Sequence, residues 1–401
     1  MKALVTHPGR QHSHQAALGL QAAGMLAGYW SGVPARAEQA GRFPALLRRR
    51  LARYAAVPLK PGRVRWFPWT PALRRLGDAL LPAAGAAWVD LFACRLFDRW
   101  AAGRLRRTPR PPDAVIACEI SALATFRIAR RQGITTILDA PSLHHQAQDR
   151  LHGTTDPPAL HRRVTRIKDQ EIALADHVLT VSALARDTYV EAGVPAGKVH
   201  AVALGADTEL FAPAGEPQPA EEGFVFLFSG ATIRRKGFDI LLDAFARVQT
   251  AEPSARLRIV GPRGDFAGLL AGRSSAAISV SGPVGQTELA AELRRADCLV
   301  LPSRNDSYGM VVPEALASGL PVLVSEMVGA KELVLPGRNG WIVPAGDVGA
   351  LAERMVWCAR HREAVRGMRE ECRLSAADAT WPAYHRRLIA LLSALVPPRR
   401  A

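Results

Sequence analysis

Short apolar runs alternate with longer amphipathic stretches along most of the chain, and this alternation predicts strands and helices in turn. In the N-terminal half, strands are expected at residues 3–6, 114–117, 135–138 and 177–181. Helices are expected at residues 15–26, with breaks near Gly24 and Gly28, and at residues 121–131 and 163–175. Strands that are apolar at nearly every position are typical of a parallel sheet with helices on both faces.

The pattern stops at residues 212–223, where Pro, Ala, Glu and Gly predominate, and this composition predicts a linker. Beyond it the alternation restarts, with strands expected at 224–228, 257–261, 277–280, 298–301 and 321–324. A helix is expected at 238–248, with its apolar positions on one face. The sequence therefore predicts an α/β fold of two doubly wound parallel-sheet domains facing a central cleft, where ligands bind beyond the carboxyl ends of the strands.

The expected domains are an N-terminal Rossmann-like domain at residues 1–207, a second Rossmann-like domain at 208–380 and a helical tail at 381–401 that crosses back to the first domain. A length of 401 residues agrees with two domains.

Composition narrows the class of protein. A hydrophobic fraction of 48% excludes a disordered chain, and no apolar run reaches the length of a membrane span. The N-terminus does not resemble a secretory signal, and the five cysteines have no paired short spacing. Reduced thiols and a cytoplasmic location are therefore expected.

The net charge of +16 is concentrated in a basic insert at residues 42–110, which carries fifteen arginines and one lysine against three aspartates. Leucines and aromatics recur there at helical spacing, as in Leu73, Leu76 and Leu80. Three interpretations remain open: the apolar stripe packs on the domain's own sheet, it contacts an anionic membrane, or the charge has no partner. A nucleic-acid partner is not expected, because no binding module is recognisable.

Two loops carry candidate chemistry. The first follows the strand ending at Leu301, and Ser307, Tyr308 and Gly309 would offer backbone amides to a diphosphate at the start of a helix. Asp306 could accept sugar hydroxyls or simply cap that helix, and Glu314 could accept from ribose hydroxyls. The second loop contains Arg234, Arg235 and Lys236, which could bind an anion or form a solvated basic turn.

Together these segments resemble glycosyltransferase family 4, whose members have the GT-B architecture of two Rossmann-like domains. The resemblance rests on SGATIRRKGFDILLDAFARV, on SGPVGQTELAAELRRADCLVLPSRNDSYGMVVPEALASGLPVLVS and on GRNGWIVPAGDVGALAERM, and is strong over residues 170–360. It implies retaining sugar transfer from a nucleoside diphosphate donor, without a metal or another cofactor. It also implies that residues 1–207 are the acceptor-side domain and residues 208–380 the nucleotide-sugar-binding domain. The chain contains no Asp-x-Asp motif for a cation.

The resemblance also implies roles for single residues. Lys236 would stabilise the departing diphosphate, Glu314 would hold the ribose and Asp306 would touch the transferred sugar. The remaining donor-binding positions that it implies are Gly9, Gly230, Arg234, Arg235, Gly282, Pro283, Val284, Ser307, Tyr308 and Gly309. Two departures affect the donor site: Asp306 stands where Glu is more common, and Ala231 stands where relatives often carry Arg.

Candidate residues of the N-terminal half are less specific. His144 and His145 follow the strand after which relatives often carry a catalytic histidine, so both are candidates, although a plain surface role is the alternative. Glu119 is expected to point toward the cleft. His7, His12 and His14 suggest a metal, but their spacing lacks a helix-face pair, and no metal site is predicted.

The function expected from the sequence is glycosyl transfer to a glycan or lipid-linked acceptor in cell-envelope polysaccharide or glycolipid synthesis. Peripheral contact with the inner face of the cell membrane is part of this expectation. The alternatives are an inactive sugar-nucleotide-binding protein, a basic nucleic-acid-binding protein and a sugar-nucleotide epimerase of the same architecture.

Overall fold

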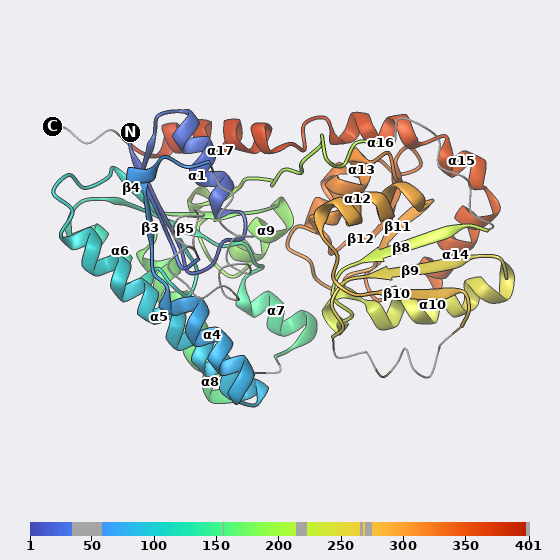
Figure 1. The fold of residues 1–401 in the computed structure, drawn as a ribbon, viewed down its shortest axis with the longest axis horizontal. Helices are drawn as coiled ribbons and strands as arrows, with labels where there is room; N and C mark the ends of the chain where they lie inside the picture. The colour runs from blue at the N-terminus through green and yellow to red at the C-terminus, as the bar shows by residue number, and fades with distance from the viewer. Residues whose placement is uncertain (34–57, 155, 214–222, 265–267, 269–274, 398–401) are drawn as a thin grey trace.

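The computed structural model describes residues 1–33, 58–154, 156–213, 223–264, 268 and 275–397. The expected linker at 212–223 and the first part of the basic insert, residues 42–57, lie largely or wholly outside this range. Two parallel sheets, each covered by helices, lie side by side along the long axis of the molecule (Figure 1). This confirms the α/β fold with two doubly wound sheets.

The first sheet has seven strands in the order β3-β2-β1-β4-β5-β6-β7. Their bounds are β1 Ala3–His7, β2 Leu26–Ser31, β3 Val64–Trp66, β4 Ala114–Cys118, β5 Thr135–Asp139, β6 His177–Thr180 and β7 Val199–Ala201. The helices are α1 Ser13–Ala22, α4 Trp69–Leu80, α5 Ala83–Arg106, α6 Leu123–Arg131, α7 His145–His152, α8 Pro158–Leu174 and α9 Ala183–Glu191. The strand order reverses between β1 and β4, which makes that point the crevice for a ligand.

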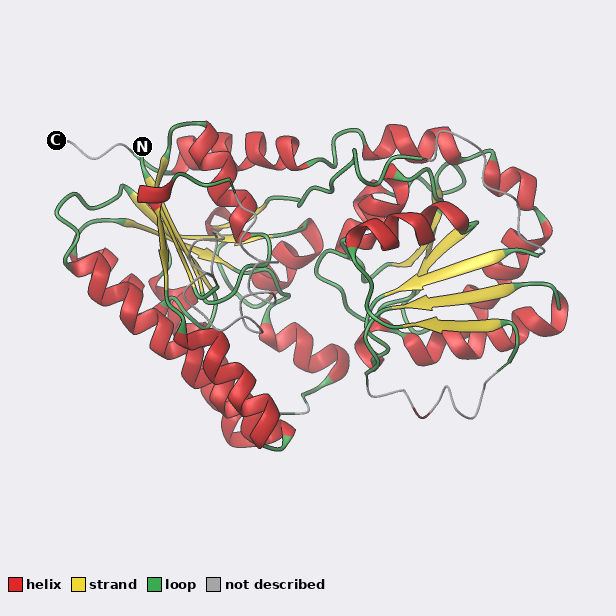
Figure 2. Cartoon of the chain, viewed as in Figure 1, coloured by secondary structure: helices red, strands yellow, loops and turns green. Residues whose placement is uncertain are grey.

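The second sheet has six strands in the order β10-β9-β8-β11-β12-β13, and its reversal lies between β8 and β11. Their bounds are β8 Val225–Ser229, β9 Arg256–Val260, β10 Ile278–Ser281, β11 Cys298–Leu301, β12 Val322–Ser325 and β13 Gly340–Val343. The helices are α10 Phe238–Ala251, α12 Gln286–Arg295, α13 Val311–Ala317, α14 Val348–Arg360, α15 Arg362–Arg366, α16 Arg369–Ala376 and α17 Trp381–Leu395. The arrowheads of this sheet point toward the first half (Figure 2).

The prediction of one helix over residues 15–26 is wrong at its C-terminal end. Helix α1 stops at Ala22, Gly24 adopts φ +69°, and Leu26 already begins β2. A positive φ ends a helix readily at glycine, because no Cβ clashes there. The break expected near Gly24 is confirmed, but the helix ends before it and strand β2 was not predicted.

Helix α17 lies along α1 of the first half, at the top of Figure 1. His385 of α17 bonds Gln15 of α1 at 3.1 Å and packs so closely on Gly19 that a Cβ there would lie 2.8 Å from the ring. The two halves are thus joined by α17 as well as by the chain between β7 and β8. The domain limits at 207/208 and 380/381 stay predictions.

Helices α4 and α5 pack against each other as a hairpin. Leu76 and Leu80 of the apolar stripe on α4 are 55% and 70% exposed, so this part of the stripe does not pack on the domain's own sheet. All five cysteines are buried and unpaired. No helix in the described part of the chain is both long enough and apolar enough to cross a bilayer.

Candidate functional site

The loops after β8 and β11 meet at the reversal point of the second sheet. The first loop forms a short 3-10 turn, η3 Arg234–Lys236, and the backbone N–H of Arg304 donates to the carbonyl of Arg235 at 2.9 Å. Lys236, at the end of this turn, forms an ion pair with Asp306. Gly237 permits this approach, since its φ is +66° and a Cβ would lie 1.9 Å from the carbonyl oxygen of Pro302.

Glu314 is the second acidic residue of this edge. It lies in the first turn of α13 and is only 8% exposed. Burial raises the pKa of Glu314 to about 8. Its carboxyl forms no hydrogen bond or ion pair with any described residue. A buried carboxyl without a protein partner is unusual, and here it lines a cavity that can receive hydroxyl donors.

The backbone before α13 offers further polar groups. The helix begins at Val311 and has seven residues, so Ser307 to Met310 belong to the preceding loop. Among the described residues, the N–H groups of these four positions donate no hydrogen bond. Gly309 adopts φ +86°, and a Cβ there would lie 2.8 Å from a methyl group of Val328. The loop therefore presents unpaired amide donors at the carboxyl edge of the second sheet.

Histidines and a glutamate stand at the facing edge of the first sheet. His12 follows β1 and bonds Asp139, the last residue of β5, at 3.0 Å. His14 bonds the carbonyl of Gln11 at 2.7 Å, and burial followed by the charge of Arg10 lowers the pKa of His14 to about 4. Glu119, after β4, forms an ion pair with Lys168, whose Nζ lies 2.9 Å from Oε2 of Glu119.

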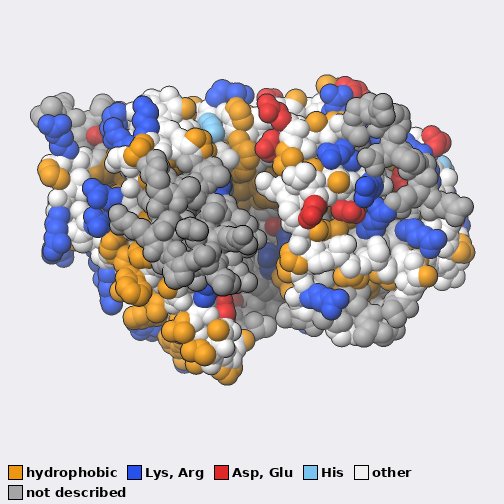
Figure 3. Space-filling model, viewed as in Figure 1, with side chains coloured by type: hydrophobic (Ala, Val, Ile, Leu, Met, Phe, Trp, Pro, Cys, Tyr) orange, Lys and Arg blue, Asp and Glu red, His pale blue; other side chains and the backbone are white. Residues whose placement is uncertain are grey.

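A cavity of about 600 Å³ lies between these two edges. The first half lines it with residues that include His12, His14, Glu119 and Ser142. The second half lines it with residues that include Arg235, Asn305, Ser307 and Glu314. The surface is hollowed between the two halves (Figure 3). An adjoining cavity of about 510 Å³ shares Gln148 and Arg235 with the first and is also lined by Arg234, His145 and Lys168.

Three hydrogen bonds cross between the halves beside the first cavity. The Tyr308 hydroxyl donates to the carbonyl of Leu204 at 2.6 Å, and the Ser182 hydroxyl donates to the carbonyl of Ser307 at 2.6 Å. The amide of Ala183 donates to Glu332 at 2.9 Å. The bonds of Tyr308 and Ser307 hold the loop before α13 against the first half.

Comparison with known proteins identifies the family. A family model described as "Glycosyl transferases group 1" matches residues 223–361, which include Lys236, Asp306 and Glu314. D-inositol 3-phosphate glycosyltransferase 1 of Catenulispora acidiphila is 30% identical over 314 residues, covering 71% of this chain and 74% of the relative. The chain belongs to glycosyltransferase family 4.

Other relatives of this glycosyltransferase match over shorter lengths. The phosphatidyl-myo-inositol mannosyltransferase of Mycobacterium leprae is 38% identical over 130 residues, which cover 32% of this chain and 34% of the relative. Among solved structures, sucrose-phosphate synthase of Thermosynechococcus elongatus has a TM-score of 0.72 at 19% identity, covering 98% of this chain and 99% of that one. Anabaena HepE, solved with UDP, has a TM-score of 0.70 at 16% identity, covering 98% of this chain and 100% of that one. These likenesses confirm the GT-B fold.

The structure brings Lys236, Asp306, Arg235 and Glu314 of the glycosyltransferase to one edge. The interpretation of Asp306 as a helix cap is wrong, because Met310 occupies the cap position of α13 and Asp306 faces Lys236 instead. Tyr308 contributes only its backbone to this edge, since its hydroxyl is bonded to Leu204.

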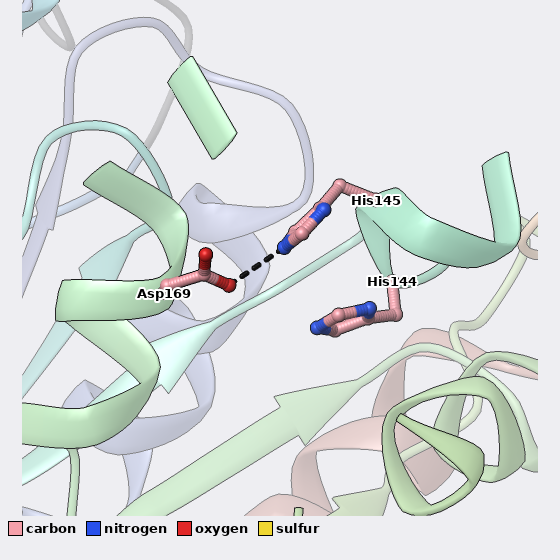
Figure 4. A group of neighbouring side chains, drawn as sticks. All are labelled: His144, His145 and Asp169. Carbon is pink, nitrogen blue, oxygen red and sulfur yellow. Dashed lines mark hydrogen bonds and ion pairs between the residues drawn. The ribbon is translucent and has the colours of Figure 1, made fainter. Parts of the chain in front are cut away.

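His144, His145 and Asp169 form a compact group, whose potential ligand atoms lie within 4.8 Å of one another (Figure 4). His145 bonds Asp169 at 2.7 Å. Nδ1 of His144 accepts the amide of Gln146 at 3.3 Å, which caps α7 and leaves the ring proton on Nε2. A protonated nitrogen does not bind a metal, so this hydrogen bond opposes metal binding by His144.

The two histidines have different environments. His145 lines the adjoining cavity, whereas His144 is buried and is not among the described residues that line either cavity. Burial, with the neighbouring His145 next in importance, lowers the pKa of His144 to about 4. In this structure His144 therefore caps helix α7. Its side chain lines neither cavity, so no contact supports the catalytic role expected for it.

The predicted glycines lie at turns of both halves. Gly9 donates its amide to His7 at 2.8 Å, and Gly230 follows β8 with its amide bonded to Val260 at 2.9 Å. Gly282, Pro283 and Val284 form the loop after β10. Of the described residues near them, Gln286 lines the larger cavity, and these three do not.

Sequence reasoning missed the bond between His12 and Asp139. From the sequence, His7, His12 and His14 were considered only as metal ligands. The signal that could have joined them is positional, because β1 and β5 belong to one parallel sheet and both residues stand at its carboxyl edge.

Proposed function

We propose that this glycosyltransferase moves a sugar, with retention and without a metal, from a nucleoside diphosphate donor to a hydroxyl acceptor. The observation that carries the donor assignment is the buried carboxyl of Glu314, which has no protein partner in the described chain and stands beside unpaired amides and cationic side chains. Ribose hydroxyls would donate to Glu314, and phosphate oxygens would accept from the amides of Ser307 to Met310.

Charge balance supports the same mechanism. When the bond between the sugar and the phosphate breaks, the diphosphate gains negative charge, and Lys236 and Arg235 lie at the edge where it would leave. Asp306, paired with Lys236, would meet the sugar. Because HepE is described in complexes with UDP and with UDP-glucose, uridine diphosphate sugars are the first donors to test.

The test is a thermal-shift panel of uridine, guanosine and adenosine diphosphates and their sugars, followed by turnover with candidate acceptors in the presence of EDTA. A ligand at 100 times its Kd stabilises by about 2.7 kcal/mol, which the panel detects. Proton NMR of the product reports retention at the anomeric carbon. Binding without transfer or hydrolysis would favour the inactive binding protein, and no stabilisation by any nucleotide would contradict the donor assignment.

We also propose that the α4–α5 hairpin contacts an anionic membrane, where a glycan or lipid-linked acceptor of envelope synthesis would be presented. Trp69, Leu76, Leu80 and Phe92 are each more than half exposed on this hairpin. Figure 3 shows hydrophobic side chains gathered at this end of the first half. The surrounding basic insert supplies positive charge that complements anionic lipid.

Flotation with vesicles of phosphatidylglycerol and phosphatidylcholine tests this contact. Leu76→Glu/Leu80→Glu should abolish flotation, whereas Leu374→Glu, which alters a leucine that is 61% exposed on α16, should not. Equal flotation of the wild type with neutral and anionic vesicles, or none with either, would overturn the membrane proposal.

A further inference from the structure

The pair formed by His12 and Asp139 has the arrangement of a base and the group that orients it. Nε2 of His12 lies 3.0 Å from Oδ1 of Asp139, and about nine-tenths of each side chain is buried. His12 lines the cavity between the halves, and Asp139 stands behind it, since it is not among the described lining residues. The imidazole is thus the member of the pair that a substrate can reach.

Hydrogen bonding fixes the tautomer of this imidazole. Asp139 accepts from Nε2, so a neutral His12 carries its proton on Nε2 and a lone pair on Nδ1. In the described chain, Nδ1 of His12 has no hydrogen-bond partner. The ring of Tyr384, from α17, packs edge-on against the imidazole of His12, with 6.5 Å between the ring centroids. This packing limits the rotation of the imidazole.

The backbone beside the pair provides an independent observation. Gln11, directly before His12 and also lining the cavity, has φ 34°, an uncommon conformation for a residue with a side chain. Backbone in such regions persists only where its surroundings hold it, and it gathers at functional sites. Here it turns the chain so that His12 meets the end of β5.

We propose that His12, positioned by Asp139, accepts the proton of the acceptor hydroxyl during sugar transfer. This inference rests on the proposed function. A lone pair of the acceptor oxygen forms the bond to the anomeric carbon, the proton moves to Nδ1 of His12, and the O–H electron pair stays on the oxygen. The bond from the anomeric carbon to the phosphate oxygen breaks with its electron pair going to the diphosphate, and His12 later returns the proton to water.

The other groups that line the acceptor side of the cavity are less suited to this step. Both oxygens of Glu119 are engaged, by Ser142 and by Lys168. His14 is a weaker base, because its pKa is lowered to about 4. Retention in a single step requires the acceptor oxygen to bond to the anomeric carbon on the face that the diphosphate leaves, and the proton then passes from that oxygen to His12.

The charge of Asp139 favours the protonated form of His12. Burial is the largest influence and lowers the pKa of His12, but the charge and hydrogen bond of Asp139 together outweigh it and raise the pKa above its ordinary value. The facing groups are Asp139 on β5, His7 on β1, His14 on α1 and Tyr384 on α17. Burial lowers the pKa of His7 to about 4, so His7 is neutral over the pH range of the assay described next.

The experiment compares the wild type with His12→Gln, Asp139→Asn and the control His200→Gln, which alters a half-buried histidine on β7. Calorimetry with UDP measures donor-site binding, and steady-state transfer is measured from pH 5.5 to 8.5. His12→Gln should lower kcat by about 10²- to 10⁴-fold while the Kd for UDP stays within twofold. The wild-type kcat should rise with pH below the pKa of His12 and then level off, and this rise should be absent in His12→Gln. Asp139→Asn should move the rise of kcat to lower pH, because the charge that raises the pKa of His12 is removed.

The outcomes separate the two proposals. If wild type transfers sugar and His12→Gln keeps either its kcat within threefold or the rise of kcat with pH, the role of His12 is wrong and the proposed function stands. If wild type neither binds UDP or another nucleotide nor transfers sugar, the proposed function itself is wrong. Should His12→Gln fold poorly, His12→Ala with added imidazole replaces it, and recovery of transfer supports the proton role, whereas no recovery contradicts it.

Discussion

The buried carboxyl of Glu314 should make the stability of the protein depend on pH. Burial raises the pKa of Glu314 to about 8, whereas a glutamate in the unfolded chain has the ordinary value of 4.5. Between these values the folded protein holds a proton that the unfolded chain has released. The contribution of Glu314 to the free energy of unfolding is therefore largest below pH 4.5. It decreases as the pH rises from 4.5 and is lost as the pH passes through 8.

The variant Glu314→Gln removes this proton exchange and keeps the shape of the side chain. The slope is about 1.4 kcal/mol per pH unit, so from pH 5.5 to 7.5 the variant should gain about 2.7 kcal/mol relative to the wild type. Urea unfolding without nucleotide, followed by tryptophan fluorescence at several pH values, measures the difference.

The matched control is Glu353→Gln, which alters an exposed carboxyl on α14. The difference in free energy of unfolding between Glu353→Gln and the wild type should stay constant over the same pH range. A difference between Glu314→Gln and the wild type that is equally flat with pH would refute the reasoning, because the carboxyl would then hold no extra proton in the folded state.

Three further changes test the site and its supports. Lys236→Ala should lower transfer about 10²-fold or more by removing charge at the departing diphosphate. The control Lys331→Ala, which removes a half-buried lysine, should leave kcat unchanged, and circular dichroism should report both folds as intact. Gly237→Ala should lower the free energy of unfolding by about 2–4 kcal/mol, measured in urea, because a Cβ would overlap the carbonyl oxygen of Pro302 at φ +66°. Glu171→Ala should lower the free energy of unfolding by about 3 kcal/mol or more, since the buried carboxyl group of Glu171 accepts three backbone N–H groups at the start of α6. Wild-type stability in this variant would contradict that support.

Sequence reasoning succeeded where a feature depends on residues close together in the chain. The apolar run of β8 and the spacing of Asp306 and Glu314 after a strand are local patterns, and each predicted its element or its place at a strand end. Even there, the end of α1 was wrong, because alanine and leucine are compatible with helix beyond the point at which Gly24 turns the chain.

Tertiary structure alone decided which of these residues meet. His12 and Asp139 are 127 positions apart, and Lys236 and Asp306 are 70 apart, so no periodicity relates them. The same holds for Glu171, which caps α6 from α8, and for Tyr308, which bonds the first half through its hydroxyl. The sequence by itself determined the alternation of elements and the residue types at the strand ends, because hydrophobic period and turn chemistry act locally. Strand order determined the partners, because it places loops from distant strands at one edge of a sheet.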